Sequence, residues 1–166
     1  MMENNDKKSK NQNKIEVYHG SGEKVEQPQI FFTKYTKDFS WGFYCTKNKE
    51  QARRWAFRKH KEGIINVYSY NENCNLNVKK FENMSNEWLD FIAMCRSGGH
   101  HEYDIVEGPM ADDTIWNFVN DFLNGDISRE VFWEYAKFKS PTHQISFHTK
   151  EALNCLHFER SENIDD

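Results

Sequence analysis

Two hydrophobic periodicities alternate along most of the chain. Runs that alternate between polar and apolar residues, or that are rich in β-branched and aromatic residues, predict strands. Runs with apolar residues at i, i+3, i+4 and i+7 predict amphipathic helices. The predicted strands are 15–21, 42–46, 64–70, 75–78, 103–109 and 143–149, the predicted helices are 48–63, 86–99, 115–123 and 128–138, and 150–158 is predicted as a short helix or strand.

The ends of several helices are marked by capping residues. Asn48 is a candidate N-cap, with Gln51 as the reciprocal half of a capping box, and Ser128 is a candidate N-cap further along. Gly63 follows the first helix as a stop signal. The segment 22–39 has little periodicity and is expected to be a loop.

The order of these elements predicts an α+β fold in a single domain. A chain of 166 residues is long enough for one domain with a real core and short for two. Strands and helices follow no regular βαβ cadence, and no GxGxxG or GxxxxGK[ST] spacing occurs, which disfavours Rossmann and P-loop folds. We expect a disordered tail at 1–14, the domain at 15–158 and a loose acidic tail at 159–166.

Composition narrows the functional classes. The net charge is -4 and the mean hydropathy is -0.92, which disfavours a duplex-binding protein, and no apolar run of about 18 residues exists to span a bilayer. The basic run 53–61 is best interpreted as the solvated face of a helix. The start of the chain has no apolar core region typical of a secretory signal. The four cysteines form no CxxC pair, so we expect reduced thiols, a cytoplasmic protein and no metal site.

Two segments place glycine beside polar or aromatic side chains. His19 lies at a predicted strand end, and the backbone of Gly20 is open to a ligand, although an ordinary turn explains this tetrapeptide equally simply. Gly42 precedes an aromatic pair, Phe43 and Tyr44, which point to opposite faces of a strand. We expect Phe43 in the core, together with Trp55, and Tyr44 facing a cleft, where its ring would stack on a planar or cationic ligand.

A third segment lies in the last predicted strand. Gln144, Ser146 and His148 share one face, which is either a solvent face or the lining of a cleft.

Taken together, these segments resemble the ADP-ribosyltransferase superfamily, in the clade of diphtheria toxin and the poly(ADP-ribose) polymerases. The chain resembles more closely a bacterial family catalogued as a domain of unknown function. This resemblance covers about residues 15–158, and it implies a split antiparallel β-sandwich with peripheral helices and a cleft between the sheets. The motifs that carry it are VYHGS (17–21), KDFSWGFYCT (37–46), QARRWA (51–56), WLDFIAMCR (88–96), YDIVEGPMADD (103–113) and HQISFHT (143–149).

The resemblance also implies roles for individual residues. His19 would bind a ribose hydroxyl of NAD, Gly20 would hold the nicotinamide amide, Tyr44 would stack on nicotinamide, and Gln144 would bind the 2′-hydroxyl of the nicotinamide ribose. The implied catalytic residues are therefore His19, Tyr44 and Gln144, and the implied NAD-binding residues are Gly20, Ser21, Gly42, Phe43 and Tyr44.

The chain departs from these patterns at two positions. Ser40 stands where the close family tends to have glycine, and Gln144 replaces the glutamate of the wider superfamily. A glutamine can orient the sugar but brings no negative charge to a cationic transition state, a loss of about 3 to 4 kcal/mol of barrier lowering. A carboxylate from elsewhere could contribute, and the nearest by motif are Asp104, Glu107, Asp112 and Asp113, for which loop capping and solvated charge are the simpler roles.

Two functions follow from the resemblance. The first is an NAD-dependent mono-ADP-ribosyltransferase that modifies a protein or nucleic-acid acceptor, such as a bacterial toxin or phage-defence effector, with an antitoxin protein as a possible partner and no membrane association. The alternative is a catalytically inactive domain that binds NAD, ADP-ribose or a protein partner. A metal site at His100 and His101 is a remote third interpretation, because adjacent residues of an extended chain point apart.

Overall fold

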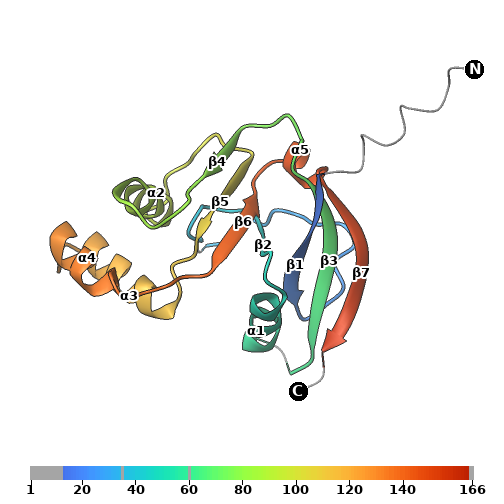
Figure 1. Ribbon diagram of the computed structural model, residues 1–166, viewed down its shortest axis with the longest axis horizontal. Helices are drawn as coiled ribbons and strands as arrows, with labels where there is room; N and C mark the ends of the chain where they lie inside the picture. Colours follow the sequence, from blue (N-terminus) through green and yellow to red (C-terminus); the bar gives the residue numbers. More distant parts are fainter. Residues whose placement is uncertain (1–12, 35, 60, 165–166) are drawn as a thin grey trace, which may run out of the picture. The chain divides into compact units, whose positions relative to one another are not determined.

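The computed structural model describes residues 13–34, 36–59 and 61–164, and within them seven strands and five helices (Figure 1). The chain forms two compact units, each built from separate stretches of sequence. Unit 1 comprises Met1–Pro28, Cys45–Leu76 and Lys150–Asp166, and unit 2 comprises Gln29–Tyr44 and Asn77–Thr149. The chain leaves unit 1 after Pro28, returns at Cys45, and leaves and returns once more.

Unit 1 is built on an antiparallel sheet of three strands. Its order is β1 (Lys14–Ser21), β3 (Gly63–Asn71) and β7 (Leu156–Ile164), so β3 is the central strand. The β-branched and aromatic composition of β3 suits that place, and most of its residues are buried. The predicted strands at 15–21 and 64–70 are therefore confirmed.

Helix α1 (Lys49–Lys59) packs on β1 and β3. Asn48 caps it as predicted, since its Oδ1 accepts the Gln51 N–H at 3.2 Å. Gln51, predicted as the reciprocal half of a capping box, accepts the Thr46 hydroxyl on its Oε1 at 3.0 Å. Ala52 and Ala56 face the sheet with no exposed surface, whereas Trp55 is only half-buried and is not the core residue that we expected.

Strand β7 corrects the prediction of a loose acidic tail for residues 159–164, and residues 165–166 of that predicted tail lie outside the described part of the chain. The strand continues to Ile164 and pairs with β3 along its length, apart from a bulge at Val67/Tyr68. Two of its charged residues have ion-pair partners: Arg160 Nη1 lies 2.9 Å from Glu16 Oε1, and Lys49 Nζ lies 2.6 Å from Glu162 Oε2. A highly charged sequence is compatible with an edge strand, because charged side chains discourage edge-to-edge aggregation while the backbone pairs inward.

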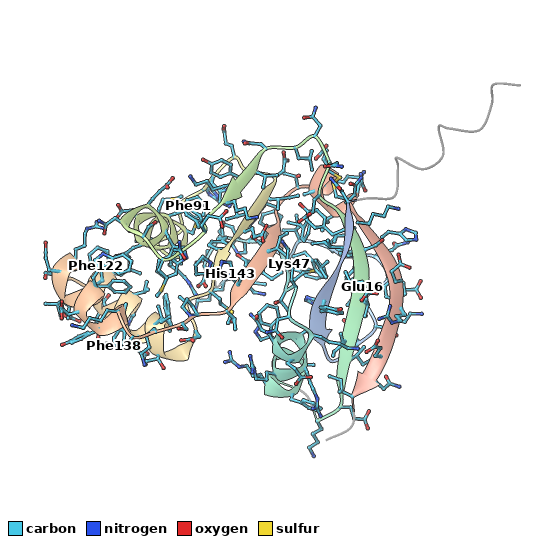
Figure 2. The ribbon with its side chains drawn as sticks, in the orientation of Figure 1. Glu16, Lys47, Phe91, Phe122, Phe138 and His143 are labelled. Carbon is cyan, nitrogen blue, oxygen red and sulfur yellow. A yellow bond between two sulfur atoms is a disulfide. The ribbon has the colours of Figure 1, made fainter. Side chains whose placement is uncertain are left out.

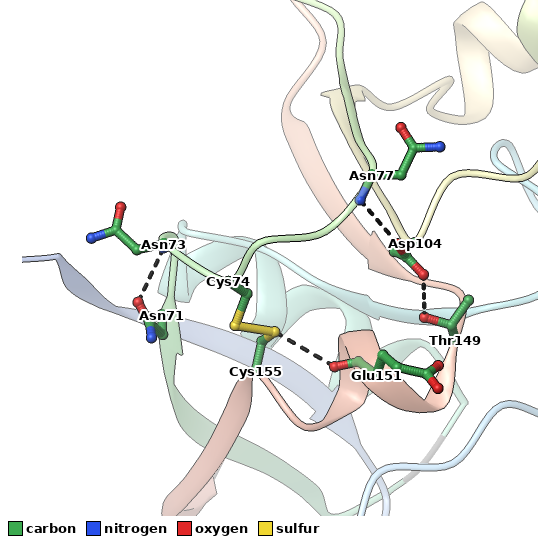
Figure 3. The surroundings of a disulfide bond; sticks show 8 residues. All are labelled: Asn71, Asn73, Cys74, Asn77, Asp104, Thr149, Glu151 and Cys155. Atoms are coloured by element: carbon green, nitrogen blue, oxygen red, sulfur yellow. Dashed lines mark hydrogen bonds between the residues drawn. A yellow bond between two sulfur atoms is a disulfide. The ribbon is translucent and has the colours of Figure 1, made fainter.

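A disulfide between Cys74 and Cys155 corrects the prediction of four reduced thiols (Figure 3). The two residues are 81 positions apart in sequence, with Cα atoms at 6.3 Å. The sheet explains their proximity: Tyr70, near the end of β3, pairs with Leu156 at the start of β7, and each cysteine lies just beyond one of these strand ends. Cys45 and Cys95 are free and fully buried, as the sequence interpretation allows.

Unit 2 contains a mixed sheet in the order β2 (Phe43–Cys45), β6 (His143–Phe147), β5 (Ile105–Pro109) and β4 (Val78–Lys80). Strands β5 and β6 are antiparallel, and β4 runs parallel to β5. The last residue of β2, Cys45, already belongs to unit 1. Strands β2, β5 and β6 were predicted, whereas the strand predicted at 75–78 is wrong except for Val78, where β4 begins.

Three helices complete the hydrophobic core of unit 2. They are α2 (Asn86–Arg96), α3 (Asp113–Leu123) and α4 (Arg129–Ala136), with N-caps at Ser85, Asp112 and Ser128. Helix α4 is shorter than predicted, which leaves Phe138 85 % exposed beyond its end (Figure 2). The fully buried core residues of unit 2 include Phe39, Trp88, Leu89, Ile92, Val106, Ile115, Val119 and Phe132.

The remaining elements complete the α+β fold class, which is confirmed. Helix α5 (Lys150–Leu153) leads into β7, so the segment predicted as a helix or a strand contains part of both. The tail predicted at 1–14 lies outside the described residues up to residue 12, and Lys14 already belongs to β1. No helix in the described part of the chain is long and apolar enough to cross a membrane.

Candidate functional site

The first predicted site segment lies in β1 of unit 1. His19, Gly20 and Ser21 are half-buried at the end of this strand, and Gly20 pairs with Ile65 of β3. A Cβ on Gly20 would come within 2.0 Å of the Ala52 carbonyl oxygen, so the glycine lets α1 approach the strand closely. Gly20 therefore has a packing role that does not depend on a ligand.

The second predicted segment places Tyr44 in the core of unit 2 rather than on an open face. Phe43 and Tyr44 are 6 % and 5 % exposed, so both are buried, whereas we expected only Phe43 in the core. The Tyr44 hydroxyl donates to the Ser40 carbonyl oxygen at 2.6 Å and accepts the Phe39 N–H at 3.0 Å. Burial, followed by the nearby charge of Asp38, raises the pKa of Tyr44 well above its usual value, so the side chain stays a neutral phenol.

The surroundings of the Tyr44 ring include a cation. The Lys37 ammonium lies 4.8 Å from the centroid of the ring, a cation–π distance, and Lys37 is itself exposed. The His148 ring meets the Tyr44 ring edge-on, with centroids 6.3 Å apart.

Gly42 is required by the close approach of Phe147, the last residue of β6, and of His148, which follows it. A Cβ at this position would lie 2.8 Å from His148 Nδ1 and 3.0 Å from the Phe147 carbonyl oxygen. The residue two positions before, Ser40, has a positive φ of 76°, which favours glycine. The structure thus gives a physical reason for the glycine expected at position 40 in the close family.

The third predicted segment places Gln144 in β6, where it is 5 % exposed. Its Nε2 donates to Asp38 Oδ2 at 3.0 Å. Asp38 Oδ2 also accepts the Ala111 N–H at 2.9 Å, and Oδ1 forms an ion pair with the guanidinium of Arg96. We call Asp38, Arg96, Ala111 and Gln144 the Asp38 cluster.

Sequence reasoning missed Asp38 as a site residue. It belongs to the KDF motif, which was the available signal, but its partners lie 58 and 106 residues away. Two of the four carboxylates nearest by motif have structural roles: Asp104 accepts the Asn77 N–H and the Thr149 hydroxyl, and Asp112 caps α3. Glu107 lies 3.9 Å from Lys80, and the side chain of Asp113 is outside the described part of the structure.

The polar row on β6 continues beyond Gln144. Ser146 Oγ lies 2.7 Å from His148 Nε2, and His148 Nδ1 lies 2.8 Å from the Trp41 carbonyl oxygen. Burial lowers the pKa of His148 to about 4, so the ring is neutral at pH 7, with its proton on Nδ1 facing the carbonyl. Ser146 is fully buried, which excludes it as a nucleophile for a bound substrate in this structure.

Two histidine rings meet in unit 2. His101 Nε2 lies 2.8 Å from the Phe39 carbonyl oxygen, and its ring centroid is 4.4 Å from that of His148. Burial lowers the pKa of His101 as well. Among the described residues no three His, Cys, Asp or Glu side chains gather as a metal site would require.

Two of the three implied catalytic residues are held by the same turn. Tyr44 on β2 binds Phe39 and Ser40, Gln144 on the neighbouring strand β6 binds Asp38, and these three turn residues are consecutive. His19, in unit 1, is not part of this group, and its proximity to Tyr44 and Gln144 stays a prediction.

The basic run 53–61, most of which lies on α1 in unit 1, forms a surface that is separate from the predicted site residues. Its exposed or half-buried residues border a depression of about 450 Å³ on α1, which contains none of the predicted NAD-binding residues. The residues that border it are Glu50, Arg53, Arg54, Phe57 and Arg58.

Comparison with known proteins identifies the family. Residues 15–158 match the profile of a family described as "Protein of unknown function (DUF3990)". The match spans most of the chain, so the protein belongs to this family. No curated protein and no solved structure matches the chain.

Proposed function

We propose that this member of the DUF3990 family is an NAD-dependent mono-ADP-ribosyltransferase with an ADP-ribosyltransferase-like fold. The observation that supports it most is that Tyr44 and Gln144 are hydrogen-bonded to the same turn, at Ser40 and Asp38. The two residues to which the resemblance assigns nicotinamide and ribose contacts are therefore held next to one another. The cation on the ring of Tyr44 adds support, since the nicotinamide ring of NAD is also cationic.

In the proposed reaction each residue assigned by the resemblance has a separate role. His19 and the backbone of Gly20 hold the ribose and the carboxamide, with Ser21, Gly42 and Phe43 completing the NAD site. Tyr44 stacks on nicotinamide after Lys37 has moved aside. The glycosidic bond breaks with its electron pair leaving on nicotinamide, and the acceptor nucleophile attacks the resulting oxocarbenium carbon and loses a proton.

Gln144 determines how fast ADP-ribose is expected to be transferred and how many ADP-ribose groups each acceptor receives. Its carbonyl oxygen accepts a hydrogen bond from the 2′-hydroxyl but offers no charge to the oxocarbenium ion. Without that charge the barrier is higher by about 3 to 4 kcal/mol than with an acidic residue, or two to three decades in rate. A slow transfer of a single ADP-ribose is therefore proposed, to a protein or nucleic-acid acceptor.

Titration calorimetry with NAD tests binding directly. The wild-type protein should release or absorb heat on binding, and His19→Ala should not. His157→Ala is the matched control, because this histidine is exposed on β7. If the wild type gives no heat at NAD concentrations in the millimolar range (about 1 mM), the proposed function fails.

The variants of Tyr44 and Gln144 separate stacking from turnover. Tyr44→Phe keeps the ring and should bind NAD, whereas Tyr44→Ala should not, and thermal unfolding of both checks that this buried position still permits folding. Gln144→Ala should retain binding and lose turnover. Equal NAD affinity in wild type and a folded Tyr44→Ala would contradict the stacking role.

A role as a toxin is a further part of the proposal, with an antitoxin as the corresponding partner. Expression in bacteria should slow growth, and His19→Ala should relieve the effect while His157→Ala should not. Equal growth with the wild type and His19→Ala would contradict an enzymatic toxin.

A second candidate function is a catalytically silent domain that binds NAD, ADP-ribose or a protein. The observation that favours it is burial: Tyr44 and Gln144 are each 5 % exposed, and the Gln144 amide N–H is engaged by Asp38. This candidate predicts heat on addition of NAD or ADP-ribose and no release of nicotinamide. Measurable nicotinamide release that depends on Gln144 would exclude it.

A further inference from the structure

Asp38 is a buried carboxylate that connects three separate parts of unit 2. Its side chain is only 3 % exposed, and both oxygens are engaged. Oδ1 faces the Arg96 guanidinium, whose Nε lies 3.1 Å away, and Oδ2 accepts from Ala111 N at 2.9 Å and from Gln144 Nε2 at 3.0 Å. Arg96 is held in turn by Trp116, whose ring centroid lies 3.9 Å from the centre of the guanidinium.

This arrangement fixes which end of the Gln144 amide faces Asp38. A carboxylate paired with arginine can only accept hydrogen bonds, so it must face the amide nitrogen. The amide carbonyl oxygen of Gln144 is then turned away from Asp38. A ligand hydroxyl can donate only to that oxygen, so the orientation decides whether Gln144 can serve as an acceptor.

We propose that Asp38 is a positioning residue, which holds the Gln144 amide with its carbonyl oxygen presented to a ribose hydroxyl. The role of the hydroxyl rests on the proposed function, whereas the coupling between residues 38 and 144 does not. Arg96 compensates the charge of Asp38, so Asp38 acts by orientation and not by adding negative charge to the site.

The same geometry explains why residue 144 is glutamine rather than glutamate. A carboxylate at 144 would place two carboxylates about 3 Å apart, at the distance now spanned by the Asp38–Gln144 bond. Two carboxylates at that distance cannot both ionise readily, and one of them must retain a proton. Restoring the superfamily glutamate alone should therefore impair the site instead of improving it.

A double-mutant cycle with exchanged amide and carboxylate tests the proposal. The variants are Asp38→Asn, Gln144→Glu and the two together, with Asp90→Asn as control, because Asp90 forms an exposed ion pair on the same unit. Each single variant should lower nicotinamide release about tenfold to a hundredfold while NAD affinity changes little. The double variant pairs one carboxylate with one amide again but loses the Ala111 N–H bond to Asp38 Oδ2, so its activity should lie above both single variants and below wild type.

Thermal unfolding of the wild type and these four variants reports on the coupling without NAD. In Gln144→Glu the paired carboxylates have a raised pKa in the folded state, so the folded protein binds more protons than the unfolded chain above about pH 4. Its midpoint should therefore fall relative to wild type as the pH rises from about 5 to 8, and the double variant should lose this trend.

The outcomes distinguish failure of the positioning role of Asp38 from failure of the proposed NAD-dependent activity. If the wild type binds and cleaves NAD but Asp38→Asn is as active, or if the double variant is weaker than both single variants, the positioning role is overturned. A wild type that does not bind NAD removes the proposed function alone. In that case the unfolding measurements decide the inference: a pH-dependent loss in Gln144→Glu that the double variant abolishes supports it, and parallel curves overturn it.

Discussion

The disulfide between Cys74 and Cys155 gives a quantitative prediction about stability. The crosslink closes a loop with a sequence separation of 81 residues. In the chain-entropy description, closing a loop of this length removes about 15 cal/mol/K of conformational entropy from the unfolded chain. At 25 °C this corresponds to about 4.5 kcal/mol of stabilisation. Since domains of this size are stable by only about 5 to 15 kcal/mol, removing the bridge should cost a large share of the stability.

Denaturant unfolding of the wild type and of Cys74→Ala/Cys155→Ala measures this effect. We expect the double variant to be less stable by about 3 to 4.5 kcal/mol, and a reductant to lower the wild-type midpoint to that of the variant. The reductant should leave the variant unchanged, because Cys45 and Cys95 are already free. Both cysteines of the bridge belong to unit 1, so the loss concerns that unit.

Mass spectrometry provides the refuting observation. Alkylation of the denatured, unreduced protein should modify two cysteines, Cys45 and Cys95, and prior reduction should expose all four. Four alkyl groups without reduction, or an unfolding midpoint that the reductant does not shift, would refute the reasoning.

Three further predictions concern unit 2. Ser40→Gly relieves a φ of 76° and should stabilise the protein by about 1 kcal/mol, or about 2 to 4 °C in melting temperature, and a lower melting temperature would contradict the strain. His148 has a folded pKa of about 4, so the unfolded chain binds more protons between about pH 4 and 6.5 and stability should fall by up to about 3 kcal/mol as the pH drops through that range. His101 adds to this slope in the same direction, and a denaturation profile for His148→Gln as steep as that of wild type would contradict the assignment. Lys37→Met removes the cation that competes for the ring of Tyr44, so NAD should bind up to about fivefold more tightly by calorimetry, and weaker binding would contradict the competition.

Elements with strong local patterns could be predicted from the sequence. The buried face of helix α3 follows from its helical periodicity, and the buried strand β3 follows from its β-branched and aromatic composition. The caps at Asn48 and Ser128 were also predictable, because a cap is determined within about four residues.

The features that sequence reasoning missed depend on distant partners. Residues 159–164 have no apolar pattern, and they form a strand because β3 offers its free edge. The disulfide depends on the pairing of β3 with β7, which brings together residues that are 81 positions apart. Local composition carries no signal for either feature.

In the candidate site, too, features set by local sequence could be predicted and features set by distant partners could not. The polar row of Gln144, Ser146 and His148 followed from strand alternation, and two of its members are hydrogen-bonded to each other. Alternation also predicted that Phe43 and Tyr44 point to opposite faces, but it did not reveal that both faces of so short a strand are covered. The role of Asp38 required the folded chain, because its partners come from α2 and β6.

Transfer of label from NAD to an acceptor tests the central claim most directly. Purified protein is incubated with bacterial lysate and NAD labelled in its adenylate group, and label in protein and nucleic-acid fractions is counted. We predict incorporation that requires His19 and Gln144 and that persists in His157→Ala. No incorporation above that of His19→Ala, by a folded wild-type protein, would contradict the assignment as an ADP-ribosyltransferase.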